Sequence, residues 1–146
     1  MSQQGYSLIE LLMGLAIGAI VLLLVSPAFA TLTESNQRDQ AAQSLIEGIR
    51  NARTTAITRN QTTVIHGING DWSQGWRIIL DISGKGPADS SNPLLLEHAS
   101  DAKVPIVGNW LVNRYVRFSN LGQPLMTGRK FQAGTLHIGS TRAAVS

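Results

Sequence analysis

The chain has 146 residues, of which 43% are hydrophobic, and a formal net charge of +3. It contains no cysteine, which excludes disulfide bonds and thiolate metal sites. Its length leaves room for one apolar segment and one small globular domain with a single core.

The most apolar stretch of the chain runs from residue 5 to residue 30 and contains one acidic side chain, Glu10. No side chain between residues 11 and 25 is polar. A helix of about 20 residues is roughly 30 Å long, which is the thickness of a bilayer's hydrocarbon core. A lone carboxylate near the centre of such a core costs at least about 2.5 kcal/mol, so Glu10 needs a partner of opposite charge. We therefore predict a membrane-spanning helix over residues 6–30 with a functional carboxylate near its start.

The start of this segment, Gly5-Tyr6-Ser7-Leu8-Ile9-Glu10-Leu11, resembles the leader junction of type IV pilins and type II secretion pseudopilins. In that family a short leader ends in glycine, an aromatic residue follows, and a glutamate is fifth in the mature chain. The resemblance implies a leader of residues 1–5, cleavage after Gly5 by a prepilin peptidase, and N-methylation of Tyr6. It also implies that the Tyr6 ammonium group meets Glu10 of a neighbouring subunit, so that both charges are neutralised in an apolar fibre core.

Two other interpretations of the apolar segment stay open. Residues 28–30, Ala-Phe-Ala, have the A-x-A pattern that ends a secretory signal, which would leave residues 31–146 as the mature chain. A plain single-pass anchor would explain the apolar run but neither Glu10 nor the glycine-aromatic junction. The pilin interpretation accounts for both, and for Pro27, because pilin helices often carry a proline where the backbone bends on assembly. The leader has no Lys or Arg, unlike most pilin leaders, and this departure bears on cleavage efficiency.

Residues 31–60 are predicted to continue the helix as an amphipathic segment. Apolar residues such as Leu45, Ile49 and Ala52 recur at three- and four-residue spacing, with charged residues between them. One face of the helix must therefore be covered by a domain. Gly48 costs about 1 kcal/mol inside a helix, so it marks either a close approach by an overlying sheet or a bend. Asn60 is the expected end of the helix.

Beyond residue 60 the apolar pattern becomes that of strands, and we predict a β domain over residues 61–146. Residues 62–66 and 76–82 are mostly β-branched or apolar and flank Asn69-Gly70, which predicts a hairpin. The breaker-rich residues 83–93 predict an exposed loop. Further short strands are expected at 94–98, 106–107, 115–118 and 135–138, for a total of five to seven. The predicted fold class is α+β, with a long N-terminal helix packed on two small antiparallel sheets.

This arrangement resembles the FimT, FimU and GspH group of minor pilins and pseudopilins. The segments that carry the resemblance are ARTTAITRN at 52–60, DWSQGW at 71–76 and VRFSNLG at 116–122. The resemblance implies a low-copy subunit with one span in the bacterial inner membrane and its C-terminal domain in the periplasm. It also implies assembly with other major and minor pilins or pseudopilins. Some members help to prime a type IV pilus and others belong to the type II secretion pseudopilus, and the sequence leaves this choice open.

The C-terminal part of the chain is basic. Between residues 104 and 146 there are five basic residues and no Asp or Glu; the five are Arg114, Arg117, Arg129, Lys130 and Arg142. FimT-type members are linked to DNA capture in natural transformation, and Gly128-Arg129-Lys130-Phe131 matches the first two positions of their G-R-x-R element. Phe131 stands in place of the second Arg, and Lys130 lacks the bidentate fork of an arginine. The block is therefore either a phosphate-binding surface for DNA or a solvated or subunit-facing basic face.

The sequence offers no catalytic constellation. The three histidines are 32 and 39 residues apart, which does not favour a metal site; they are His66, His98 and His137. Gly84-Lys85-Gly86 is followed by Pro87 and by no helical pattern, so we expect a turn rather than a phosphate loop. The three tryptophans are expected in the core or at strand rims; they are Trp72, Trp76 and Trp110. We therefore predict no enzymatic activity, no metal or other cofactor and no small-molecule substrate.

Overall fold

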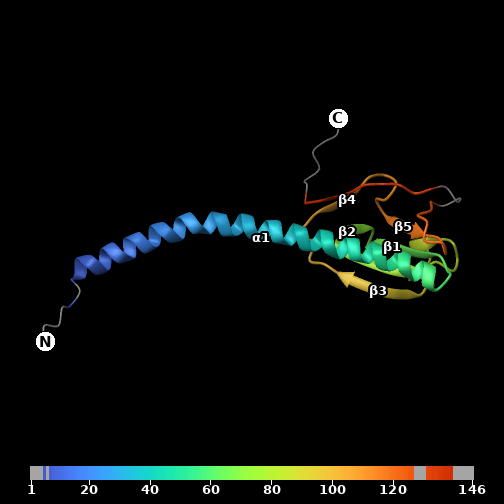
Figure 1. The fold of residues 1–146 in the computed structure, drawn as a ribbon, viewed down its shortest axis with the longest axis horizontal. Helices are drawn as coiled ribbons and strands as arrows, with labels where there is room; N and C mark the ends of the chain where they lie inside the picture. The colour runs from blue at the N-terminus through green and yellow to red at the C-terminus, as the bar shows by residue number, and fades with distance from the viewer. Residues whose placement is uncertain (1–4, 6, 127–130, 140–146) are drawn as a thin grey trace. The chain divides into compact units, whose positions relative to one another are not determined.

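The computed structural model describes residues 5, 7–126 and 131–139 (Figure 1). Their first element is a long helix, α1 (Leu8–Thr58). Six strands follow among the described residues: β1 (Thr63–Ile68), β2 (Asp71–Leu80), β3 (Leu94–Ala99), β4 (Ile106–Gly108), β5 (Tyr115–Phe118) and β6 (Leu136–Ile138). One 3-10 turn, η1 (Gly86–Ala88), lies between β2 and β3. The chain forms two compact units, Met1–Gln37 and Arg38–Ser146, and α1 contributes to both.

The first unit contains the apolar part of α1. Its most apolar window of 18 residues has a mean hydropathy of 2.8, and none of that window is buried inside the protein. By length and composition the helix can therefore cross a membrane. Pro27 lies inside α1, and its carbonyl accepts a hydrogen bond from Thr31 Oγ1 at 3.1 Å. An exposed apolar surface of this size is typical of a segment that contacts a membrane or another protein.

In the second unit α1 packs on the larger sheet through a narrow stripe of small residues and one leucine. The buried positions are Leu45, Gly48, Ala52 and Ala56, which repeat at three- and four-residue intervals as the sequence predicts. A Cβ on Gly48 would lie only 2.7 Å from Cε2 of Trp76. Gly48 therefore marks a close approach by the sheet, which is the first of the two alternatives that the sequence left open. The helix ends at Thr58, two residues before Asn60, which has a φ of 51°.

We expect Gly48→Ala to destabilise the domain, although alanine is the better helix former. The added methyl group would lie 2.7 and 2.8 Å from two indole carbons of Trp76 and 3.1 Å from Cδ1 of Ile65, and both residues are buried in the core. Overpacking of this kind typically costs about 1–3 kcal/mol, which exceeds the gain of about 1 kcal/mol in helix propensity. Denaturant titration of a fragment without residues 1–30 would measure the loss. The matched control, Arg50→Ala on the exposed side of α1, should change the unfolding free energy by less than about 0.5 kcal/mol.

The larger sheet has four antiparallel strands in the order β3-β2-β1-β5. β1 and β2 form the predicted hairpin, in which Asn69 and Gly70 both have positive φ, 54° and 76°, as a type I′ turn requires. Ile65 of β1 pairs with Ile78 of β2 and with Val116 of β5, and all three belong to the buried core. β4 and β6 form a second, two-stranded antiparallel sheet. The structure confirms the predicted α+β class with two small antiparallel sheets.

Two tryptophans fix the core by hydrogen bonds as well as by packing. Trp72 is 2% exposed and donates Nε1–H to the carbonyl of Val112 at 3.0 Å. Trp76 is 7% exposed and donates Nε1–H to Ser44 Oγ at 3.4 Å, which joins β2 to α1. Both therefore lie in the core as predicted. Trp110 is 76% exposed, so the prediction of a core or strand-rim position is wrong for that residue.

Candidate assembly site and basic region

Glu10 lies in the first turn of α1, where it forms a reciprocal cap with Ser7. Ser7 Oγ accepts a hydrogen bond from the Glu10 amide at 3.4 Å, and Glu10 Oε2 accepts one from the Ser7 amide at 3.2 Å. This arrangement is a capping box, and the positive end of the helix dipole favours a carboxylate at the same place. The sequence carries the signal for it, Ser followed three residues later by Glu before an apolar run, and the prediction for Glu10 missed it. Tyr6 lies outside the described residues.

The face of α1 that carries Glu10 is shallow and apolar. Glu10, Gly14 and Gly18 follow one another at four-residue spacing and line a groove of about 580 Å³ together with leucine and alanine side chains. Apart from the neighbouring backbone of the helix itself, no described atom lies within 4 Å of where a Cβ of either glycine would be. Small residues at this spacing allow a second apolar helix to approach closely. The carboxylate is therefore placed where the start of another apolar helix could reach it.

The basic residues of the C-terminal part do not share one environment. Arg129, Lys130 and Arg142 lie outside the described residues. Arg114 is exposed before β5, where its carbonyl accepts a hydrogen bond from the Gly67 amide at 3.3 Å. Arg117 is only 8% exposed. We therefore correct the prediction that Arg117 adds to an exposed phosphate-binding surface, because its side chain is used inside the domain.

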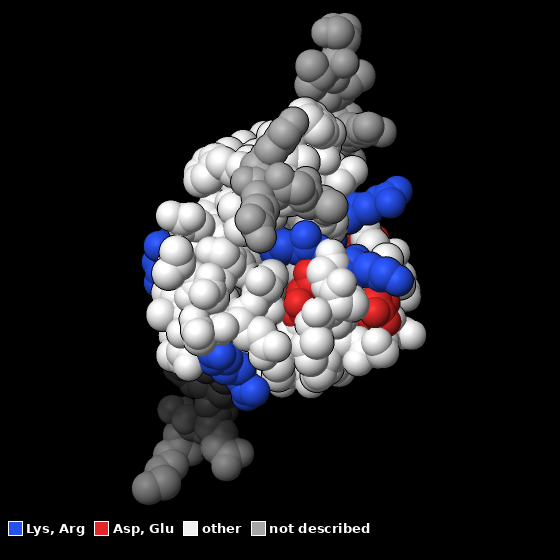
Figure 2. Space-filling view, turned by 90° about the vertical axis from the view of Figure 1, so that its right-hand side faces the viewer, with Lys and Arg blue, Asp and Glu red and all other residues white. Residues whose placement is uncertain are grey.

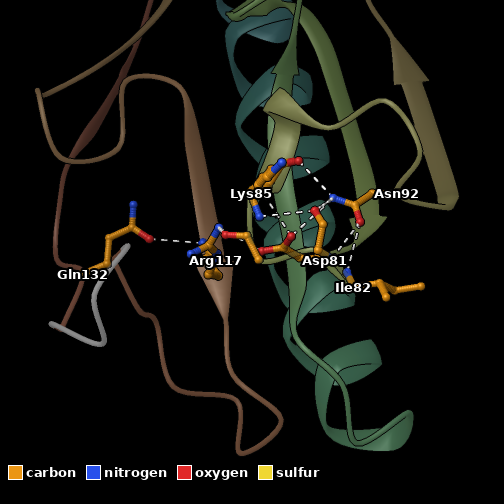
Figure 3. A network of polar contacts seen from close by, with 9 residues as sticks. Asp81, Ile82, Lys85, Asn92, Arg117 and Gln132 are labelled. Carbon is orange, nitrogen blue, oxygen red and sulfur yellow. Dashed lines mark hydrogen bonds and ion pairs between the residues drawn. The ribbon is translucent and has the colours of Figure 1, made fainter.

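Arg117 is the centre of a buried polar network that ties the loop after β2 to β5 (Figure 3). Its Nη2 lies 2.8 Å from Asp81 Oδ2 and donates a hydrogen bond to the Gly84 carbonyl at 3.0 Å. The contact with Asp81 lacks the alignment of a hydrogen bond, so charge attraction holds the pair. Asp81 Oδ1 accepts hydrogen bonds from the Gly86 amide at 2.9 Å and from Asn92 Nδ2 at 3.3 Å. The predicted loop over residues 83–93 is thus mostly exposed but anchored at its base.

Gln132 fixes the chain on the other side of Arg117. Its Oε1 accepts a hydrogen bond from the Arg117 amide at 3.1 Å, and its Nε2 donates to the carbonyls of Leu111 and Tyr115 at 2.8 and 2.9 Å. The Gln132 amide donates to the Pro124 carbonyl at 3.1 Å. The chain is therefore held against β5 on the C-terminal side of residues 127–130.

One face of the described surface is mixed in charge. Figure 2 shows Lys and Arg side chains in separate groups on that face, with Asp and Glu side chains next to some of them. A phosphate backbone is bound best by a continuous row of cations. The described residues of this face do not provide such a row.

The histidines lie on three different strands, with His66 on β1, His98 on β3 and His137 on β6. No group of three metal-ligating side chains occurs among the residues that the structure describes. Burial lowers the pKa of His66, the hydrogen bond with the Gly67 carbonyl acts in the opposite direction, and the Arg77 charge lowers the pKa further. His98 stacks on Trp76 with ring centroids 5.3 Å apart. His66 and His98 therefore both interact with other residues of the β domain.

An apolar N-terminal helix that continues into an antiparallel β domain defines this chain as a pilin-like protein of the minor pilin and pseudopilin group. The family described as type II transport protein GspH matches residues 41–146, and the prokaryotic N-terminal methylation motif matches residues 1–26. The chain therefore belongs to the GspH family. The fold is similar to the crystal structure of the Pseudomonas aeruginosa type IV minor pilin FimU, with 23% identity, a TM-score of 0.51, and coverage of 64% of this chain and 67% of that chain. No curated protein matches the chain.

Proposed function

We propose that the protein is a minor subunit of a type IV pilus that helps to prime assembly. Before assembly it is held in the bacterial inner membrane by α1, with its β domain in the periplasm. The observation that carries this proposal is the uncovered apolar part of α1. Its most apolar window has a mean hydropathy of 2.8 and is 0% buried, and the methylation motif matches residues 1–26 at this end of the chain. Such a helix is stable in lipid or among other apolar helices, and a subunit that moves from membrane to fibre uses both.

The family match supports a second candidate, a GspH-type minor pseudopilin of type II protein secretion. The same anchor and the same domain would serve either fibre. Deletion of the gene separates the two candidates: loss of surface pili with normal secretion supports the pilus, and loss of a secreted protein with normal pili supports the pseudopilus. Complementation with the full-length chain is the control.

Processing provides the first test of this function. We propose that a prepilin peptidase cleaves after Gly5 and that Tyr6 is then N-methylated. A Cβ on Gly5 would meet no atom of the described residues within 4 Å, so we expect a larger residue there to affect the peptidase rather than the fold. We expect Gly5→Leu to retain the leader and to block incorporation, whereas Gln4→Ala should be processed normally. Mass spectrometry of the N-terminus measures leader cleavage and N-methylation in both variants. An N-terminus at residue 31 would establish the secretory-signal interpretation instead.

We further propose that Arg129 and Lys130 bind DNA phosphates without sequence preference, for uptake in natural transformation. The support is the sequence, in which both follow Gly128 inside a stretch of 43 residues without Asp or Glu. Arg114, exposed before β5, and Arg142 are further candidates for this surface. So few cations give weak binding by one subunit, which becomes effective when several subunits on one fibre engage the same DNA.

A salt titration tests this proposal on a fragment without residues 1–30. The logarithm of affinity should fall against the logarithm of salt concentration with a slope of roughly −0.9 per phosphate contact. Replacing both Arg129 and Lys130 with glutamine should lower the steepness of that slope by about 2 and weaken binding similarly for every DNA sequence. The matched control replaces Arg59 and Lys103, two exposed basic residues outside the block, and should leave the slope unchanged. Equal slopes for wild type and the Arg129/Lys130 variant would show that these two residues do not bind DNA and belong to a solvated or subunit-facing surface.

A further inference from the structure

β3 is an open edge of the four-stranded sheet. It pairs with β2 from Gly75↔Ala99 to Ile79↔Leu94, and Figure 1 shows no described segment along its other side. Five of its six residues are exposed, including Leu94 at 55% and Leu96 at 42%. An edge strand presents unpaired backbone N–H and C=O groups, which a strand from another chain can pair with.

β3 has few of the features that usually prevent such pairing. Its sequence, LLLEHA, contains neither lysine nor proline. Its single charged residue, Glu97, forms an ion pair with Arg77 on the neighbouring strand β2. The register shift between Ile78 and Ile79 disturbs the pairing only at the start of β3, so residues 96–99 pair regularly. These four residues are suited to accept a further strand.

A polar groove of about 370 Å³ lies between this edge and α1. Gln43, Glu47 and Asn51 line it from the helix, and Leu96 and His98 line it from β3. Leu96 and His98 are two residues apart, so both side chains point to the same face of the sheet, towards α1. Glu47 is the one acidic residue among those that line the groove, whereas the whole chain has a net charge of +3.

We propose that the β3 edge binds an extended segment of a neighbouring subunit as an added strand, with a basic side chain of that segment in the groove beside Glu47. The inference rests on the proposed function, because the neighbour is supplied by the fibre. The Glu47 carboxylate and the side-chain carbonyls of Gln43 and Asn51 can accept hydrogen bonds from an ammonium or guanidinium group, and a partner carboxylate would be repelled.

A second β3 edge is a poorer partner than a different segment. Neighbouring subunits of an open fibre meet through two different surfaces, because a self-complementary contact closes into a dimer. In an edge-to-edge dimer the two Glu47 side chains would bring like charges to the same interface. The added strand must therefore come from another part of the neighbouring subunit.

The absence of cysteine allows a direct test in the full-length chain, expressed in cells that assemble the fibre. His98→Cys places one thiol on the open edge, and Leu96→Cys serves as a second variant if the first enters fibres poorly. Maleimide labelling should be at least about tenfold slower in sheared fibres than in the membrane fraction, since the thiol is then covered more than about nine-tenths of the time. The control is Leu121→Cys, at a turn residue that is 72% exposed, which should label at similar rates in both fractions.

Reversal of the Glu47 charge tests the chemistry of the occupant. Glu47→Arg in the His98→Cys chain should restore the membrane rate of labelling in fibres, and Glu47→Gln should restore it in part. Unchanged protection with Glu47→Arg would contradict a basic occupant, and equal labelling of His98→Cys in the two fractions would show that the edge stays open. Both results overturn the inference and leave the fibre function standing, since the chain is then present in fibres. A wild-type chain that never enters fibres would contradict the proposed function and this inference with it.

Discussion

Glu10→Val is expected to leave the protein in the membrane and to abolish its incorporation into fibres. Valine removes a carboxylate that costs at least about 2.5 kcal/mol near a bilayer core, so membrane insertion is not impaired. If the Tyr6 ammonium group pairs with Glu10 of a neighbouring subunit, as the pilin resemblance implies, the variant leaves that ammonium group without a counter-charge among apolar helices. Removing one partner of a buried pair costs about 3–5 kcal/mol, which is more than a hundredfold in the assembly equilibrium. Immunoblots of sheared fibres and of membranes from the same cells measure the ratio of incorporated protein to protein that stays in the membrane.

Because Glu10 also caps the helix, the control variants must separate the loss of the cap from the loss of the charge. Ser7→Ala removes the cap and keeps the carboxylate, so it should cost about 1 kcal/mol of helix stability and leave incorporation nearly normal. Glu10→Gln keeps a side-chain acceptor for the Ser7 amide and removes the charge, so it should fail to assemble as the valine variant does. Normal incorporation of Glu10→Gln as the sole copy would show that hydrogen bonding at the helix end, rather than charge pairing, is what assembly requires.

The elements that the sequence predicted well are those specified by local patterns. The hairpin of β1 and β2 follows from Asn69-Gly70, because two adjacent positive φ values require residues of this kind and a two-residue turn sets the register of both strands. The face that α1 presents to the sheet follows from its three- and four-residue apolar spacing. Gly48 was ambiguous, since only tertiary structure shows that Trp76 occupies the place of its missing side chain.

The environment of Arg117 could not be read from local sequence. Alternation along β5 directs Val116 and Phe118 towards α1 and Arg117 towards the opposite face, which predicts exposure. That face is instead covered at this end by the loop after β2, and the loop brings Asp81 to the guanidinium group. Counting charges over residues 104–146 therefore overstated the surface charge, because the neutralising carboxylate lies on a distant strand end.

Arg117→Ala is expected to lower the unfolding free energy by about 3–5 kcal/mol, because it leaves the Asp81 carboxylate buried without its counter-charge. The Asp81 side chain is 0% exposed and that of Arg117 is 10% exposed. The matched control is Arg77→Ala, whose partner is Glu97 and whose pair has side chains 39% and 38% exposed. An ion pair at the surface contributes about 0–1 kcal/mol, so denaturant titration of a fragment without residues 1–30 should separate the two variants clearly.

Two further measurements identify the cause of that loss. Asp81→Asn in the Arg117→Ala chain should recover part of the stability, since an amide oxygen can still accept the hydrogen bond from Gly86 and carries no charge to leave unpaired. The loss caused by Arg117→Ala should also change little between low and high salt, whereas any loss at Arg77 should shrink as salt screens the exposed pair. A loss no larger than that of Arg77→Ala would show that the network does not stabilise the domain.

DNA binding gives an independent test of where the Arg117 side chain lies. If Arg117 contacted DNA phosphates, Arg117→Ala would reduce the steepness of the salt slope of DNA binding by about 1. Because its charge is buried against Asp81, the slope of the folded variant should equal that of wild type.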